Sequence, residues 1–154
     1  TKYHAFSDAL IGSLRFYGRS INTFSDRENV KLSERLYVPS KYLRGFESGR
    51  IGPVDALDHV GGNYATALGF NAALPKLLPN LSNADFSLFL DTANVWGVDY
   101  DDSVDKSSQI RSAFGVSIDW ITPIGPLNFS FSEAITSAST DKPESFRFNI
   151  GTTF

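Results

Sequence analysis

Apolar and polar side chains alternate along most of this chain, and the alternation is clearest near its end. Phe146, Phe148 and Ile150 would share one face of an extended segment, with Arg147 and Asn149 on the other. Successive side chains of a β-strand point to opposite faces, so this period of two predicts a strand over about residues 144–154. The same pattern predicts five earlier strands, near residues 10–19, 67–74, 86–91, 110–120 and 127–132.

The lengths of these segments and of their connections indicate a fold class. Strands of roughly 9–13 residues are long enough to cross a bilayer when tilted, whereas soluble strands more often have about 5–6. Residues 75–83 and 122–126 make short connections, and residues 20–62 and 96–108 make long ones. Short turns at one end and long loops at the other are typical of outer-membrane barrels. We therefore predict an all-β fold, an antiparallel meander of about six long strands that forms the C-terminal part of a transmembrane β-barrel.

The same parity predicts an orientation. A barrel strand that ends at Phe154 leaves the C-terminus on the periplasmic side, where short turns lie. Counting back, the loops near Ser139, Asp102 and Arg44 lie on the outer side. The turns near Ser7, Pro79 and Ile124 then lie on the inner side.

The stretch from about residue 20 to 62 is too long for an ordinary connection, and its composition is not that of a disordered segment. It contains many apolar side chains, among them Phe24, Leu43, Phe46 and Ile51, so it is expected to fold back onto the sheet. Arg44 would then be held close to other groups, and a desolvated guanidinium needs a carboxylate partner. The alternation places Asp91 and Asp119 on the polar face of the strands.

Composition excludes several classes of function. The 154 residues contain no cysteine, so there is neither a disulfide framework nor a thiolate metal site, and the net charge of −3 gives no basic footprint for nucleic acid. No metal site or cofactor is expected. The acidic run from Asp99 to Asp105 lacks the ordered glycine and terminal glutamate of an EF-hand and is interpreted as a solvated loop. The chain opens at Thr1 as if in mid-strand, which suggests the C-terminal part of a longer protein.

Several motifs together resemble the BamA branch of the outer-membrane assembly-factor (bacterial surface antigen) superfamily. The resemblance covers nearly the whole chain, in order and with plausible spacing. The motifs that carry it are Leu43-Arg44-Gly45-Phe46, Ile51-Gly52-Pro53, Val60-Gly61-Gly62-Asn63, Asp91-Thr92-Ala93-Asn94-Val95-Trp96, Thr122-Pro123-Ile124-Gly125-Pro126-Leu127 and the final nine residues from Phe146 to Phe154.

The resemblance implies that the long loop folds into the barrel lumen, with Arg44-Gly45-Phe46 at its tip. The family's arginine pairs with acidic side chains on the inner wall, and Asp91 matches one of them. The preceding strand usually offers a glutamate where this chain has Asn71, so Arg44 would have one carboxylate partner instead of two. Our hypothesis is that Asp119 compensates. Ile51, Gly52 and Pro53 belong to the same loop motif.

For the last strand the resemblance implies two roles. Phe146, Phe148, Ile150 and Phe154 would form the signal for the protein's own assembly, and the strand would form one side of a lateral seam with the first barrel strand. Gly151 matches the glycine at which the family's final strand kinks inward. A missing side chain near a strand end weakens pairing, which suits a seam that opens.

The expected function is therefore the folding and insertion of β-barrel proteins into the outer membrane of a Gram-negative bacterium, with no enzymatic step. Expected partners are unfolded outer-membrane clients, accessory lipoproteins and outer-membrane lipid, and not nucleic acid. The missing N-terminal strands and periplasmic repeat domains would complete the machine. The alternatives are a translocation or secretion barrel (TamA-like or a two-partner secretion transporter), a passive diffusion porin, and a soluble β-sandwich.

Overall fold

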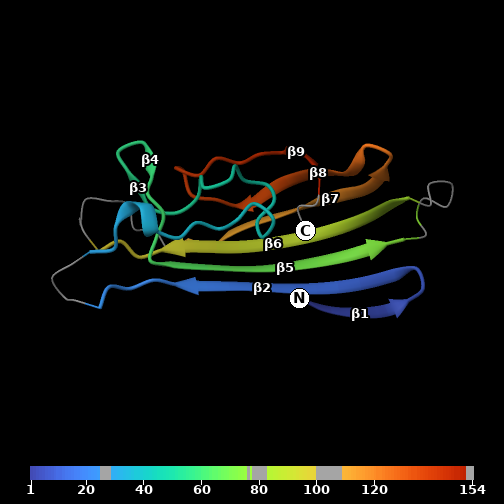
Figure 1. Ribbon diagram of the computed structural model, residues 1–154, viewed down its shortest axis with the longest axis horizontal. Helices are drawn as coiled ribbons and strands as arrows, with labels where there is room; N and C mark the ends of the chain where they lie inside the picture. The colour runs from blue at the N-terminus through green and yellow to red at the C-terminus, as the bar shows by residue number, and fades with distance from the viewer. Residues whose placement is uncertain (25–28, 76, 78–82, 100–108, 152–154) are drawn as a thin grey trace.

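The computed structural model describes residues 1–24, 29–75, 77, 83–99 and 109–151. A seven-stranded antiparallel sheet has the order β1-β2-β5-β6-β7-β8-β9 (Figure 1). Its strands are β1 (Lys2–Ser7), β2 (Leu10–Ser20), β5 (Tyr64–Leu74), β6 (Ala84–Trp96), β7 (Arg111–Thr122), β8 (Gly125–Thr136) and β9 (Phe146–Ile150). Neighbours in the sheet follow one another along the chain, so the sheet is a meander interrupted by one long loop between β2 and β5. The predicted all-β antiparallel fold is confirmed.

The structure corrects the expected strands in two places. Each of the six predicted segments overlaps a strand, but β1 forms a seventh, of which the sequence indicated only that the chain opens as if in mid-strand. The last strand is also shorter than predicted, because β9 spans five residues rather than the whole of 144–154. Pro143 precedes it and Gly151, with φ +99°, follows it. Phe154, expected to belong to this strand, lies outside the described residues.

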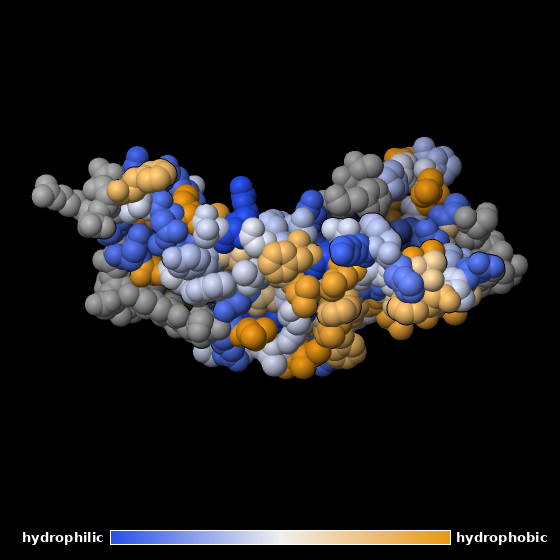
Figure 2. All heavy atoms as spheres, turned by 90° about the horizontal axis from the view of Figure 1, so that it is seen from below, coloured by the Kyte–Doolittle hydropathy of each residue, from blue (hydrophilic) through white to orange (hydrophobic). Residues whose placement is uncertain are grey.

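The two faces of the sheet differ as the alternation predicted. Side chains such as Phe70 (51% exposed) and Phe114 (52%) point outward, whereas Ala113 and Asp91 on the opposite face are fully buried. Figure 2 views the molecule from the β1 edge and shows apolar side chains gathered over its middle, with mostly polar side chains at the end that carries the long loops. Exposure of so many apolar side chains to water is unfavourable, so this outward face is suited to an apolar surrounding such as lipid.

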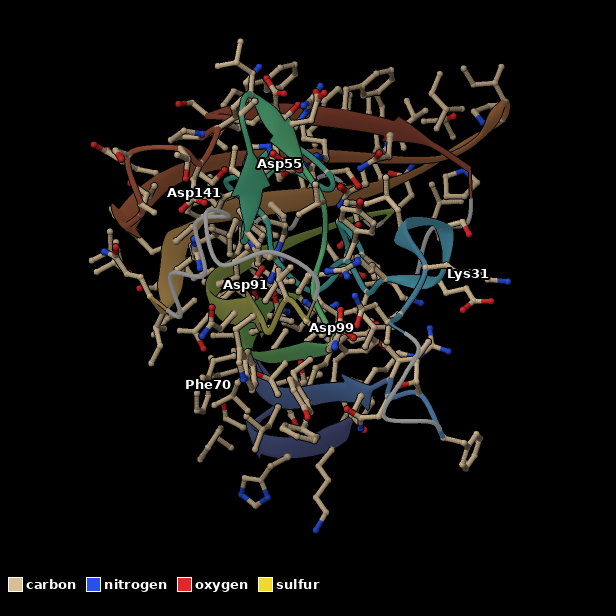
Figure 3. The ribbon with its side chains drawn as sticks, turned by 90° about the vertical axis from the view of Figure 1, so that its left-hand side faces the viewer. Lys31, Asp55, Phe70, Asp91, Asp99 and Asp141 are labelled. Atoms are coloured by element: carbon tan, nitrogen blue, oxygen red, sulfur yellow. The ribbon has the colours of Figure 1, made fainter. Side chains whose placement is uncertain are left out.

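The long loop lies inside the curve of the sheet. Figure 3, which looks along the strands, shows the sheet curling around the loop. The main apolar core joins Val38, Leu43, Phe46 and Ile51 of the loop to small inward residues of β5, β6 and β7, namely Ala65, Ala67, Ala93, Val95 and Ala113. Small residues on the sheet let the loop backbone approach closely. The loop therefore contributes the large side chains of the core, and the sheet contributes the small side chains on which they pack.

The loop has some regular structure of its own. It contains a short 3₁₀ helix, Leu32–Glu34, and a two-stranded hairpin of β3 (Val54–Asp55) and β4 (Asp58–His59). The hairpin lies at the same end of the sheet as the other long connections, while the β1–β2 and β7–β8 turns lie at the opposite end (Figure 1). Among the described residues, no helix is long and apolar enough to span a membrane.

Candidate functional site

The centre of the site is an ion pair between the loop and the sheet. Asp91 on β6 is fully buried, and Arg44 of the loop donates to it from Nε to Oδ2 at 2.7 Å and from Nη2 to Oδ1 at 2.9 Å. The backbone N–H of Arg44 also donates to Oδ2, at 3.1 Å. A two-pronged guanidinium–carboxylate contact fixes orientation as well as distance, because two parallel bonds define a plane. The structure thus brings together the arginine and the aspartate that the sequence singled out.

Other groups surround this pair. The Arg44 guanidinium lies over the ring of Phe89, with 3.5 Å between Cζ and the ring centroid, a geometry in which the ring's negative face attracts the cation. Arg15 of β2 is a second cation, with its Nη2 3.8 Å from Asp91 Oδ1. On β5, Gly69 leaves room for this contact, since a Cβ there would lie 2.9 Å from Asp91 Oδ1. The buried carboxylate therefore has two arginines around it.

The structure does not support the hypothesis that Asp119 replaces the family's second carboxylate. Asp119 accepts a hydrogen bond from Asn128 Nδ2 at 2.7 Å, and in the described part of the chain it forms no ion pair with Arg44. Asn71 and Asp119 line the same polar cavity of about 300 Å³ that Arg44 borders. The Arg44 side chain is 14% exposed, and the part that Asp91 does not cover borders this cavity.

The residues next to Arg44 let the loop pack tightly on β7. Gly45 has φ +88°, and a Cβ on it would lie 2.5 Å from the Cβ of Ala113, so both conformation and space require glycine. Phe46 is 1% exposed and belongs to the apolar core. Burial of a phenylalanine side chain stabilises the docked loop by about 1.5–3 kcal/mol.

The second loop motif packs in the same way on β6. Ile51 is buried, and Pro53 is among the most fully buried side chains. Gly52, with φ +100°, lies so close to β6 that a Cβ would be 2.9 Å from the Cβ of Val95. This motif therefore anchors the loop near the outer-loop end of the sheet.

The loop also forms backbone hydrogen bonds with the segment before β9. Glu144 N donates to Gly45 O at 3.0 Å, Glu47 N to Lys142 O at 2.9 Å, and Lys142 N to Arg50 O at 3.2 Å. These bonds flank an isolated antiparallel bridge between Phe46 and Pro143. The motif loop is thus held by a short ladder of main-chain bonds in addition to its side chains.

Two further ion pairs hold the loops, and reasoning from the sequence did not identify either. Arg111 on β7 and Asp141 are both fully buried and form bonds of 2.8 and 3.1 Å, which fix the 137–145 segment. Arg35 donates from Nη2 to Asp99 Oδ1 at 2.8 Å. Burial acts to raise the pKa of Asp99, but hydrogen bonds from Val30 N–H and the Asn63 side chain, together with Arg35, hold the pKa below its usual value. The alternation did place Arg111 on the polar face, but sequence spacing gave no signal for its partner.

The proposed seam strand presents Phe146, Phe148 and Ile150 outward, with Arg147 and Asn149 inward. Phe146 and Phe148 pair with Phe131 and Phe129 of β8, at ring-centroid distances of 5.0 and 4.9 Å. Gly151 donates its N–H to Pro126 O at 2.9 Å. Of the acidic run considered as a calcium loop, all but Asp99 lies outside the described residues.

Comparison with known proteins gives this arrangement a family. The model of the Omp85 superfamily domain matches residues 1–154. A protein named outer membrane protein assembly factor BamA, from Neisseria meningitidis serogroup B, is 27% identical over 141 residues, covering 73% of this chain. A protein of the same name from Neorickettsia risticii is 27% identical over 130 residues, covering 82% of this chain. The chain spans 17% of the length of each of these relatives.

A solved structure is similar over almost the whole chain. It is the crystal structure of BamA from Haemophilus ducreyi lacking POTRA domains 1–3, which matches with a TM-score of 0.82 and 25% sequence identity. The match covers 95% of this chain and 32% of that one. The curled seven-stranded sheet with its inward loop therefore has the architecture of part of a BamA barrel.

Proposed function

The chain belongs to the Omp85 superfamily, and on that premise we propose that it forms the C-terminal part of an outer-membrane barrel that folds and inserts other β-barrel proteins. In this proposal the long loop lies in the barrel lumen and the outward apolar face contacts outer-membrane lipid. The remaining strands and the periplasmic repeat domains belong to other parts of the full-length protein. Unfolded outer-membrane proteins are the clients, and accessory lipoproteins are partners.

The observation that carries the proposal is the docked loop. An external loop of a passive barrel has no need of a buried carboxylate on the wall, because burial of an isolated charge is costly unless it is paired. Here Asp91 is fully buried, and Arg44 donates three hydrogen bonds to it. The buried charge on the wall is therefore paired by the docked loop. The relatives that carry the name of an assembly factor support the same function.

The proposed mechanism involves no covalent chemistry. The last strand would form one side of a lateral seam, and a client strand would pair with its free backbone edge, as in other cases of strand addition. A docked loop would keep the barrel wall in one shape while the seam opens. β9 is short and pairs with β8 through five residue pairs, so the strand at the proposed seam is held by few backbone bonds.

The related secretion barrels remain the second candidate function, because a lumen loop locked to the wall suits a translocation barrel as well. An assembly barrel and a secretion barrel differ in the protein that they handle. They do not differ in the Arg44–Asp91 ion pair that holds the loop to the barrel wall, which we call the lock. A diffusion porin is less well supported, since the loop and its ion pairs occupy the inner face of the sheet.

The proposal is tested in cells that depend on the full-length protein. We expect Arg44→Ala to lower the amount of correctly folded outer-membrane clients, measured by heat-modifiable mobility on gels. Arg19→Ala, at an exposed arginine on the neighbouring strand β2, is the matched control and should leave clients unchanged. Normal client levels with Arg44→Ala would show that the lock is not needed for assembly. Secretion of one dedicated substrate, with clients unaffected, would assign the chain to a secretion barrel.

The position of the loop is tested separately by disulfide formation between Arg44→Cys and Asp91→Cys in membranes. The chain has no cysteine of its own to interfere. We expect efficient cross-linking, because the Arg44 backbone N lies only 3.1 Å from the Asp91 side chain. Free labelling of Arg44→Cys from outside the cell, without cross-linking, would mean that the loop is external.

A further inference from the structure

The outer half of the last strand is held differently from the inner half. β9 pairs with β8 from Leu127↔Ile150 to Phe131↔Phe146, whereas β8 itself continues to Thr136. On the N-terminal side of Phe146 the chain turns inward over the loop, and Ser132 of β8 still donates to it from N to Ser145 O at 2.9 Å and from Oγ to Glu144 O at 3.2 Å. The loop therefore takes over the support of β9 where strand pairing ends.

Arg147 provides this support with a single side chain. Its Nη1 donates to Ser40 O at 3.2 Å, its Nη2 donates to Phe46 O, and its Nε donates to Glu144 Oε2 at 2.8 Å. Ser40 and Phe46 lie on either side of Arg44, so Arg147 spans the turn that carries the lock. The Arg147 side chain is 14% exposed, which means that its donors depend on these acceptors.

Only arginine can make this set of bonds. The guanidinium has five N–H donors in a fixed plane, and it can reach two carbonyls and a carboxylate together. Lysine has a single nitrogen, and glutamine has a shorter side chain with one NH₂ group. The contact therefore depends on the chemistry of this side chain and not on its volume.

In the described part of the chain, Arg147 is the β9 side chain that hydrogen-bonds to the loop. The main-chain ladder from Gly45 and Glu47 reaches the segment before β9, and the buried Arg111–Asp141 pair holds that segment to β7 independently. Asn149, the next inward side chain of β9, reaches across to Asn128 Oδ1 at 3.4 Å and not to the loop. Movement of the loop can therefore act directly on β9 through Arg147.

We propose that Arg147 is a positioning residue that couples the docked state of the Arg44 loop to the position of the last strand. While the loop is docked, Arg147 holds the outer end of β9, and loss of docking loosens it. Coupling of this kind is reciprocal, so loosening β9 also weakens docking of the loop. The inference rests on the proposed function in one respect, namely that β9 is the strand at which the barrel opens for clients.

The test measures backbone hydrogen–deuterium exchange of the full-length protein in lipid, in peptides that cover the loop around residues 40–47 and in peptides that cover β9. We expect Arg147→Gln to speed exchange about tenfold in both regions, equivalent to about 1.4 kcal/mol of lost local stability. The matched control Asn149→Ala, on the same strand and the same face, should speed exchange in β9 but not in the loop. If Arg147→Gln fails to assemble, Arg147→Lys keeps the charge and serves the same comparison.

A double-variant cycle separates coupling from simple weakening of β9. Arg44→Ala should speed exchange of β9 when Arg147 is present and should add nothing in the Arg147→Gln background. The proposal would be overturned if Arg44→Ala left the exchange rate of β9 unchanged. It would also be overturned if the effects of the two substitutions on that rate were additive. Coupling without any defect in client assembly would leave this inference standing and remove the proposed function. A client defect without coupling would do the reverse.

Discussion

Asp91→Asn is the most direct perturbation of the lock, because it removes one charge and leaves the shape of the side chain almost unchanged. Asparagine has one acceptor oxygen and one NH₂ group in place of two acceptors. Arg44 would therefore lose at least one of the two side-chain bonds, which are 2.7 and 2.9 Å long, and its guanidinium would face another donor. Arg15, 3.8 Å from the same carboxylate, would lose its only ion-pair partner among the described residues.

The expected cost follows from burial. Asp91 is fully buried and Arg44 is 14% exposed, so the pair is close to the buried limit, where removal of one partner typically costs about 3–5 kcal/mol. The freed guanidinium would still border the polar cavity beside Arg44, where water can enter and solvate it. We therefore expect a loss of about 3 kcal/mol, at the lower end of this range.

The assay is urea unfolding of the full-length protein in detergent micelles, from which the free energy of unfolding is obtained by linear extrapolation. Asp85→Asn is the control, since Asp85 is an exposed carboxylate at an inward position of the same strand. Adding Arg44→Gln to Asp91→Asn should cost less than the sum of the two single changes, because no unpaired loop cation is left. A loss of less than about 0.5 kcal/mol relative to Asp85→Asn would refute the reasoning, since ordinary surface substitutions stay within that range.

Two further predictions concern the loop. Gly45→Ala should prevent close docking, because the new Cβ would lie 2.5 Å from Ala113 Cβ. Gly49→Ala should cost less, since its nearest contact would be 3.6 Å, although φ is positive at both positions; protease sensitivity of the loop distinguishes them. The second prediction concerns pH: burial and, to a lesser extent, Arg50 lower the pKa of His59 below 6.5. Above pH 6.5 the imidazole is neutral whether the loop is docked or free, and as the pH falls through 6.5 the undocked loop takes up the proton first, so docking weakens. His59→Gln should lose less thermal stability than the wild type between pH 7.5 and 5.5, and equal losses would contradict the assignment.

Much of the sheet could be predicted because successive side chains of a β-strand point to opposite faces, so apolar and polar residues alternate along the sequence. Phe70, Phe114 and Phe148 lie on the outward face and Asp91 on the inward face, as the alternation required. The shortness of β9 could not be predicted in this way, because Phe146 to Phe154 alternates beyond the point where strand pairing ends. β3 and β4, with two residues each, are too short to show any period.

The sequence by itself determined the fold class and the faces of the strands, because periodicity is a local signal. The alternation placed both Asp91 and Asp119 on the polar face, and the family resemblance carried by the arginine motif singled out Arg44 and Asp91 as partners. Only the tertiary structure decided which of the other charges meet across distant segments. Arg111 pairs with Asp141, and Arg35 pairs with Asp99. Arg147 donates to the carbonyls of Ser40 and Phe46, which are 107 and 101 residues away in the sequence. No spacing rule links such partners, because the path of an irregular loop depends on where its apolar side chains can be buried. The curvature of the sheet sets that place, and it arises only when all the strands are paired.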